Sequence, residues 1–372
     1  MCSRSGDVIE PLIKPQWYVR SDGMAKAAAD AVRSGELRLE PDAHKSTWFG
    51  WLDNIQDWCI SRQLWWGHRV PAYFVIVAGR PRGEQSDASQ WEVGRSEEAA
   101  RASAAARLGV PPESITLEQD PDVLDTWFSS GLFPFATFGW PDTECADFKA
   151  FYPNTLLETG HDILFFWVAR MVMLGLTLTG KLPFKTVYLH AMVRDKYGRK
   201  MSKSLGNVVD PMEVISGCTL EALHAKIREG NLPPKEVEQA IKGQTADFPE
   251  GIPECGADAL RFGLLAYTLQ GRDINLDISR VVGYRQFCNK LWNATRFALA
   301  HLSLDRFTPA PLMDALDELT GPAWPRLATR DQWILSRLHS ASVACEAALQ
   351  SYSFAAACTA AYDFWLYEVS MG

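Results

Sequence analysis

The sequence predicts an α/β fold built on a parallel sheet, followed by a helical region. A nearly continuous apolar run at residues 186–193 is typical of a strand buried on both faces. It follows residues 161–178, which have the length and apolar content of a buried helix. A helix followed by a buried strand is the order of elements that is typical of a parallel α/β sheet. Helical patterns without intervening strands then predict the second region, at residues 256–270, 280–302 and from 331 onward.

The composition is that of an ordinary globular protein with two to three domains. The chain has 372 residues, of which 47% are hydrophobic and 22% are charged, and this excludes disorder as the main theme. Lys and Arg number 37 against 45 Asp and Glu, a net charge of −8, so no global basic field indicates nucleic acid, although local patches can still bind it. None of the 8 cysteines lies within four residues of another, which excludes a local CxxC metal site or redox pair.

We expect no membrane segment and a reducing compartment. The most apolar stretch, residues 163–178, contains Arg170 and fits a buried helix rather than a membrane span. The first residues contain no apolar run of the kind that a secretory signal needs. A chain of this size does not need disulfide bonds to stabilise its fold, so we expect its cysteines to be free thiols in a reducing compartment.

Before residue 122, four segments can be predicted in order. Asp22 is a candidate cap for a helix at residues 24–33 that stops at Ser34-Gly35, and an extended segment follows at residues 36–41. The tryptophan-rich residues 48–66 predict an aromatic core element, with packing as its only role as the alternative. Residues 79–119 are polar and predict a peripheral insertion, with one helix at residues 96–108 closed by Gly109.

Two further local patterns lie on either side of residues 186–193. Residues 175–182 have Walker A spacing, but Leu182 stands where the magnesium-binding hydroxyl would be, so the run is interpreted as a helix end with Gly180 as its stop. Asp210-Pro211 predicts a helix start, because a capping residue precedes proline at the first helical position. A polar, proline-containing insertion is expected between Ser216 and Pro253.

The sharpest feature is a basic loop, residues 193–207, directly after the predicted buried strand. It carries one acidic residue, Asp195, and five basic ones: Arg194, Lys196, Arg199, Lys200 and Lys203. Loops at the carboxyl edge of a parallel sheet line the ligand crevice, and ammonium groups there can neutralise charge on a leaving pyrophosphate. A solvated surface loop is the alternative interpretation.

The residues Lys200-Met-Ser-Lys-Ser204 match, letter for letter, the second signature of class I aminoacyl-tRNA synthetases. Nearly the whole chain then resembles the valyl-tRNA synthetases. The resemblance includes the segment that returns from the editing insertion, the amino-acid and ATP segments, the stem-contact region and the first anticodon-domain helix, at residues 58–71, 122–131, 158–167, 256–262 and 287–297.

The resemblance implies a role for individual residues. Lys200, Ser202 and Lys203 would form the catalytic signature, with Lys203 at the ATP phosphates. Gly160 and Asp162 would meet the ATP ribose.

The remaining implied contacts involve the base and the amino acid. Met192 and Val193 would pass beside adenine through backbone contacts, with a purely structural role as the alternative. Trp127 and Trp167 would wall the valine pocket, because a small branched side chain is recognised by shape and burial; core packing is the alternative. ATP accompanied by Mg²⁺, valine and tRNA(Val) would be the ligands, with no metal held by the protein alone.

The resemblance also implies a domain order within a partial Rossmann-type catalytic domain and an incomplete helical bundle. The four parts would be the tail of the editing insertion and return segment, the carboxyl half of the catalytic domain with the insertion at residues 79–119, the signature and stem-contact region, and the start of the anticodon-binding domain, at residues 1–45, 46–195, 196–280 and 281–372.

The first class I signature, His-x-Gly-His, has no match, because no two of the 7 histidines are three residues apart. We therefore expect a fragment of a longer synthetase that is inactive alone. The alternatives are a non-catalytic tRNA- or protein-binding fragment, and an isoleucyl or leucyl relative. Cytoplasm and mitochondrial matrix are both compatible with the sequence, and the oligomeric state stays open.

Overall fold

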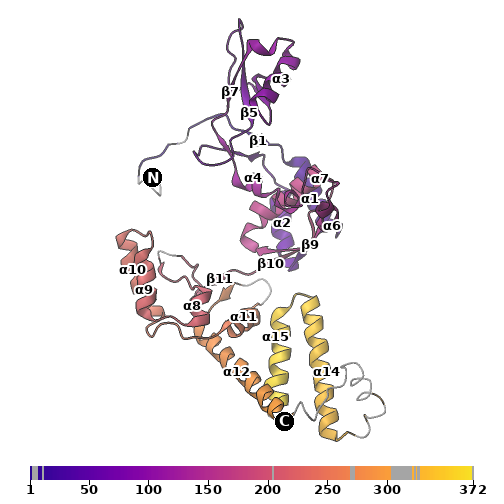
Figure 1. Cartoon of the computed structure of the whole chain (residues 1–372), viewed down its shortest axis with the longest axis vertical. Helices are drawn as coiled ribbons and strands as arrows, with labels where there is room; N and C mark the ends of the chain where they lie inside the picture. Colours follow the sequence, from indigo (N-terminus) through magenta and orange to yellow (C-terminus); the bar gives the residue numbers. More distant parts are fainter. Residues whose placement is uncertain are drawn as a thin grey trace. The chain divides into compact units, whose positions relative to one another are not determined.

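The computed structural model describes residues 1, 7–10, 12–202, 205–268, 273–302, 321, 324 and 327–370. The chain divides into two compact units, Met1–Leu189 and His190–Gly372. Figure 1 shows strands and helices in the first unit and mainly helices in the second. Each unit is described by itself.

The first unit is built on a three-stranded sheet in the order β2 (Arg38–Glu40), β10 (Phe184–His190), β9 (Asn154–Gly160). The central strand β10 runs parallel to β2, with Val187 opposite Leu39. Both of these side chains are fully buried. The predicted buried strand is therefore confirmed, although it ends at His190 rather than at residue 193.

The helices α1 (Asp22–Arg33) and α7 (Arg170–Thr179) contact each other and contribute apolar side chains to the same core as the central strand β10. The helix α1 buries a face of alanines. The predicted cap is off by one residue, because the N-cap is Ser21, and Asp22 lies in the first turn, where its charge favours the helix dipole. As predicted, the helix stops at Ser34-Gly35, and Gly35 adopts φ +82°.

The single helix predicted for residues 161–178 is three consecutive pieces. A 3₁₀ turn η4 (His161–Ile163) leads into a π-helical turn η5 (Leu164–Ala169), and only then does α7 begin. By length and composition, His161–Thr179 could cross a bilayer. Many of its apolar side chains pack into the core of the first unit, although Phe166 and Leu178 are exposed, and Gly180 ends the helix at φ +69°, the predicted stop.

The predicted peripheral insertion is a small α/β body. Strand β5 (Ala72–Val77) pairs antiparallel with β6 (Trp91–Val93) and β7 (Ile115–Gln119), and α3 (Glu97–Leu108) packs on these strands (Figure 1). The body thus begins before Gly79, because β5 is its central strand. The helix prediction is confirmed: Ser96 caps its start, and Gly109 ends it in the left-handed conformation.

The tryptophan-rich segment is only partly core. Trp48, in α2 (Lys45–Leu52), is buried, and Trp58 lies in β3 (Trp58–Cys59). Trp65 and Trp66 contradict the prediction, since they are 91% and 78% exposed. The remaining short elements of this unit are β1 (Tyr18–Val19), β4 (Ser61–Arg62), β8 (Val123–Leu124), α4 (Thr126–Ser130), α5 (Phe133–Ala136), α6 (Ala146–Phe151), η1 (Asp42–His44), η2 (Ala88–Gln90) and η3 (Pro112–Ser114).

The second unit begins with a two-stranded parallel pair, β11 (Val193–Arg194) and β12 (Ile274–Asn275). Between and after these strands the described residues are mainly helical, and the helices predicted at residues 256–270, 280–302 and from 331 onward are confirmed with shifted bounds. The helices are α8 (Pro211–Ser216), α9 (Leu220–Glu229), α10 (Pro234–Asp247), α11 (Ala257–Ala266), α12 (Ile278–His301), α14 (Thr329–Gln350), α15 (Phe354–Asp363) and the π-helical turn η8 (Phe364–Val369).

The start of α8 is confirmed, because the Asp210 carboxylate accepts a hydrogen bond from the Met212 backbone N–H. The helices α9 and α10 were not predicted in the polar stretch from Ser216 to Pro253. They contact each other, and each buries only a narrow apolar stripe that includes Leu223 and Ala240, so their polar composition masked the helical period.

Candidate functional site

Trp127 and Trp167 lie on neighbouring elements of the first unit. Trp127 lies in the first turn of α4, whose N-cap Asp125 accepts the Trp127 backbone N–H at 3.1 Å. The Trp167 indole Nε1 donates to the Ser130 carbonyl oxygen at 3.2 Å, at the end of the same helix. The Trp127 ring centroid lies 6.5 Å from that of Phe166. The structure therefore brings the two predicted pocket segments together around α4.

Asp125 also holds α4 to neighbouring segments through its side-chain hydrogen bonds, a role that sequence reasoning missed. Its side chain is buried and accepts hydrogen bonds from the Arg62 guanidinium at 2.8 Å and the Trp58 indole at 3.1 Å. The Arg170 guanidinium lies 3.9 Å from the Trp58 ring centroid and 3.6 Å from the Asp125 carboxylate. Burial lowers the pKa of Arg170, and the Asp125 charge opposes this shift. The signal available in the sequence was an acidic residue at the cap of α4.

A cavity of 680 Å³ lies beside α4. Its lining includes Thr126, Ser129 and Ser130 of α4 and Arg62 and His68 from the preceding segments. Trp127 and Trp167 are not among the residues that line this cavity, whose polar groups include hydroxyls of α4 and the Arg62 guanidinium.

Gly160 and Asp162 lie where β9 ends and η4 begins. Gly160 is buried and Asp162 is exposed. Between them, His161 stacks on His44 with ring centroids 5.5 Å apart. Burial, and then the charge of His161, lowers the pKa of His44.

The basic loop starts in the second unit with a tight hairpin, residues 195–199. Arg194 and Lys200 form an antiparallel bridge, and Gly198 supplies φ +78° at the turn. The Asp195 carboxylate, 5% exposed, accepts the backbone N–H groups of Tyr197 at 3.0 Å and Arg199 at 2.8 Å. Desolvation by itself would raise the pKa of Asp195, but hydrogen bonds, foremost from Asn207, lower it.

Asn207 ties the far end of the loop to this hairpin, another role that sequence reasoning missed. It is 1% exposed, and its Nδ2 donates to the Asp195 carboxylate at 2.9 Å and to the Lys200 carbonyl oxygen at 3.3 Å. Its Oδ1 accepts the Ser202 backbone N–H at 2.9 Å. The backbone at two predicted signature residues, Lys200 and Ser202, is thus fixed by one buried amide.

The basic side chains of the loop fall into two groups. Arg194 pairs with Asp273, Lys196 pairs with Asp247 at 3.5 Å, and Arg199 pairs with both Asp195 at 2.6 Å and Asp247 at 3.2 Å. Lys200 is exposed and makes no ion pair within the described part of the chain. Lys203, the predicted phosphate lysine, lies outside the described residues.

The predicted adenine-contacting residues lie at the start of this loop: Met192 directly precedes it, and Val193 is its first residue. The Met192 backbone is occupied on both sides: its N–H donates to the Asp273 carboxylate at 3.2 Å, and its carbonyl accepts the Ile274 N–H at 2.8 Å. Val193 lies opposite Ile274 in the parallel pair, a position whose own N–H and C=O point away from the partner strand. Val193 is therefore the better placed of the two for a backbone contact.

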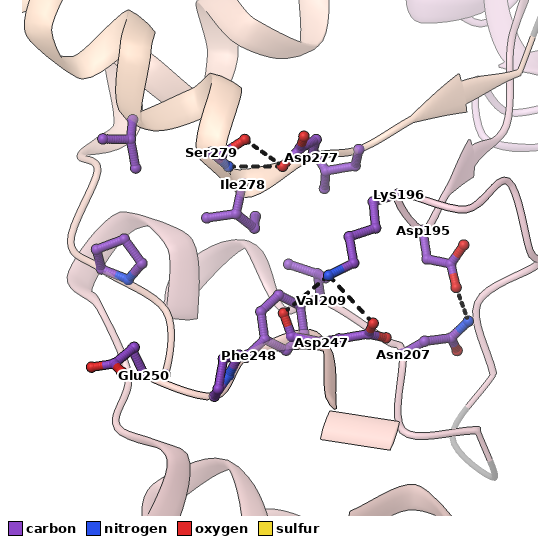
Figure 2. Close-up of a pocket in the computed structure, with 15 residues that line it drawn as sticks. Asp195, Lys196, Asn207, Val209, Asp247, Phe248, Glu250, Asp277, Ile278 and Ser279 are labelled. Atoms are coloured by element: carbon purple, nitrogen blue, oxygen red, sulfur yellow. Dashed lines mark hydrogen bonds and ion pairs between the residues drawn. The ribbon is translucent and has the colours of Figure 1, made fainter. Parts of the chain in front are cut away.

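A cavity of 580 Å³ lies beside the hairpin, and Figure 2 shows the residues that line it. The Lys196 ammonium contacts Asp247 in its lining, and the Asp195–Asn207 hydrogen bond also belongs to this lining. The apolar side of its lining includes Val209, Phe248 and Ile278.

The comparisons with known proteins identify the class. Residues 3–277 match the family described as tRNA synthetases class I (I, L, M and V). The chain belongs to this family. The basic loop, residues 193–207, lies within the residues that match the family.

Valine–tRNA ligases are among the similar proteins. The chain is 60% identical over 371 residues to that of Rattus norvegicus, covering 99% of this chain and 29% of the relative. It is 55% identical to that of Schizosaccharomyces pombe, covering 99% and 36%. The mitochondrial valine–tRNA ligase of Saccharomyces cerevisiae is 53% identical, with coverage of 98% and 32%. The chain therefore spans about a third of the length of these relatives.

Solved structures share the fold. The methionyl-tRNA synthetase of Mycobacterium tuberculosis bound to methionyl-adenylate matches with a TM-score of 0.56 at 18% identity, covering 94% of this chain and 51% of that one. The LeuRS–tRNA–LeuAMS complex of Agrobacterium radiobacter K84 matches with a TM-score of 0.51 at 19% identity, covering 85% and 37%. The α/β prediction for a class I synthetase is thereby confirmed.

Proposed function

We propose that the chain serves the attachment of valine to tRNA(Val) through an ATP-dependent valyl-adenylate. The observation that carries this proposal is 60% identity to a valine–tRNA ligase across 99% of the chain. The literal signature at residues 200–204 supports it from the residues themselves.

In this reaction the loop residues would act on the phosphates of ATP. Lys203 would stabilise charge on the leaving pyrophosphate, and Lys200, exposed and unpaired among the described residues, would be available for the same anion. Asn207 fixes the Ser202 N–H and the Lys200 carbonyl, which supports a loop held ready before ATP binds.

The ribose and the base would meet other parts of the chain. The Asp162 carboxylate is exposed, so it can accept the two vicinal hydroxyls of the ribose beside Gly160. For the adenine contact, the occupied backbone of Met192 favours Val193. Magnesium would enter with ATP and neutralise charge on its phosphates.

Trp127 and Trp167 would form apolar walls for the valine side chain. The Trp167–Ser130 hydrogen bond orients the Trp167 indole toward α4, and Trp127 lies in the first turn of this helix. Two rigid aromatic walls suit a small branched side chain, because discrimination in such a site depends on volume.

A non-catalytic tRNA- or protein-binding role is the second candidate. The observation that favours it is the lack of a His-x-Gly-His signature in the sequence. An isoleucyl or leucyl specificity is a third possibility, since the matched family includes I and L members. The compartment is proposed as cytoplasm or mitochondrial matrix, and some relatives have mitochondrial in their names.

One experiment separates these functions. Amino-acid-dependent exchange of pyrophosphate into ATP is measured with valine, isoleucine and leucine in a full-length synthetase that contains this sequence. Exchange with valine alone supports the proposal, and a preference for another amino acid overturns the specificity. Binding of tRNA without any exchange favours the non-catalytic role.

A further inference from the structure

The helix α10 contacts the basic loop on both sides of residues 200–204. Before the signature, the Asp247 carboxylate at the end of α10 faces Lys196 at 3.5 Å and Arg199 at 3.2 Å. The Asp247 side chain is 7% exposed, and Figure 2 shows it directed at the Lys196 ammonium. One nearly buried carboxylate therefore binds two cations of the hairpin.

After the signature, the loop and α10 approach each other backbone to backbone. A Cβ on Gly206 would lie 2.2 Å from the Ala240 carbonyl oxygen, and a Cβ on Gly243 would lie 2.5 Å from the Leu205 carbonyl oxygen. Only glycine permits contact at these distances. Gly206 on the loop and Gly243 on α10 therefore both allow the loop and the helix to pack closely together.

The exposure of Lys196 and Arg199 indicates that their contact with Asp247 orients the loop more than it stabilises the fold of the second unit. Lys196 and Arg199 have side chains that are 34% and 48% exposed, so water can solvate them if the carboxylate is lost. Arg199 also keeps its second partner, Asp195. Removal of the Asp247 charge should therefore loosen the hairpin while the fold remains.

We propose that α10, through Asp247, holds residues 195–202 in the conformation that presents Lys200, and that Asp247 is a positioning residue for amino-acid activation. The catalytic part of this proposal rests on the proposed function. The restraint on the loop does not, and it can be measured on the chain itself.

The test on the 372-residue chain uses trypsin, because Arg199 and Lys200 are cleavage sites within the restrained segment. Cleavage after these two residues is followed by mass spectrometry in the wild type, in Asp247→Asn, in Asp247→Glu, and in Glu238→Gln, an exposed acidic residue on the same helix. We expect cleavage at least about fivefold faster in Asp247→Asn, close to wild type in the two others, and an unchanged melting temperature.

Equal cleavage rates in Asp247→Asn and wild type would overturn the restraint. So would a lowered melting temperature with faster cleavage throughout the chain, because Asp247 would then be a stability residue.

The catalytic part is tested in a full-length synthetase that contains this sequence. We expect Asp247→Asn to lower kcat for valine-dependent pyrophosphate exchange by about tenfold, with the KM for valine unchanged, because the loop is assigned to ATP. Unchanged kcat would overturn the positioning role. Absence of exchange in the wild type, together with faster cleavage in Asp247→Asn, would instead refute the proposed function and leave the restraint standing.

Discussion

Among single residues, Lys203 carries the most direct prediction. In a full-length synthetase containing this sequence, Lys203→Ala should lower the rate of valine activation about 10²- to 10³-fold, because one preorganised donor to developing charge is lost. Valine binding should change little. Pyrophosphate exchange and equilibrium binding measure the two effects, with Lys235→Ala, an exposed lysine of α10, as the control. A change in activation below about threefold would show that Lys203 is not the phosphate lysine.

Trp167 carries a prediction about specificity. Trp167→Ala should raise the valine concentration needed for activation and admit isoleucine, because a methylene in a hydrophobic site is worth only about 1–3 kcal/mol of selectivity. The ratio of kcat/KM for valine and isoleucine measures this effect, and Trp292→Ala, at a 71% exposed position in α12, is the control. An unchanged ratio in a folded variant would place Trp167 in the core instead of the pocket.

His44 makes the first unit sensitive to acid. Its pKa in the folded chain is lowered by burial and by stacked His161, whereas the unfolded chain has the ordinary value of about 6.5. The unfolded chain therefore takes up the proton first. The stability contribution is complete above about pH 6.5 and is lost as the pH falls below it.

Melting temperatures at pH 7.5 and pH 5.5 check this prediction. His44→Asn should lose less stability on acidification than the wild type, whereas His339→Asn, an exposed control, should behave like the wild type. If His44→Asn and the wild type lose the same stability, the folded chain does not resist protonation at His44.

At the scale of elements, the contact between α10 and the basic loop predicts an asymmetry between two glycines of similar conformation. Gly206 has φ +65° and meets the Ala240 carbonyl, while Gly180 has φ +69° with no atom near its missing Cβ. Gly180→Ala should cost only the left-handed penalty of about 1–2 kcal/mol. Gly206→Ala should cost about 3 kcal/mol or more, because overpacking adds to that penalty.

Urea unfolding of the two variants measures these costs. Equal losses of unfolding free energy would mean that the loop and α10 can separate without cost.

The predicted elements differ in how far local sequence defines them. The helix ends at Ser96, Gly109 and Asp210 were predictable, because capping depends on the residue and its immediate neighbours. The π-helical turn at Leu164–Ala169 was not, because the same apolar residues satisfy an ordinary helical pattern. Tertiary packing selects between the two.

For the whole molecule, we predict that the 372-residue chain by itself does not catalyse valine-dependent pyrophosphate exchange. Its sequence lacks the His-x-Gly-His signature, and a parallel sheet binds nucleotide where strands from both halves meet, so we expect these residues to supply only one side of that crevice. Exchange should appear when the remaining sequence of a full-length synthetase is present. Robust exchange by the chain alone would mean that other residues replace the signature.

The sequence by itself determined the class of the protein and located the segment that we propose for contact with the ATP phosphates. Residues 200–204 are contiguous, so their chemistry can be interpreted without the fold. The same holds for the buried strand before them, whose apolar run predicts burial on both faces.

Only the tertiary structure decided which charges of the basic loop are already paired. Asp247 is 48 residues from Arg199, and Asn207 is 12 residues from Asp195, yet each pair meets in the folded chain. No local sequence pattern identifies such partners, because ion pairs and close backbone contacts depend on distance in space. These residues come close only when α10 packs against the loop.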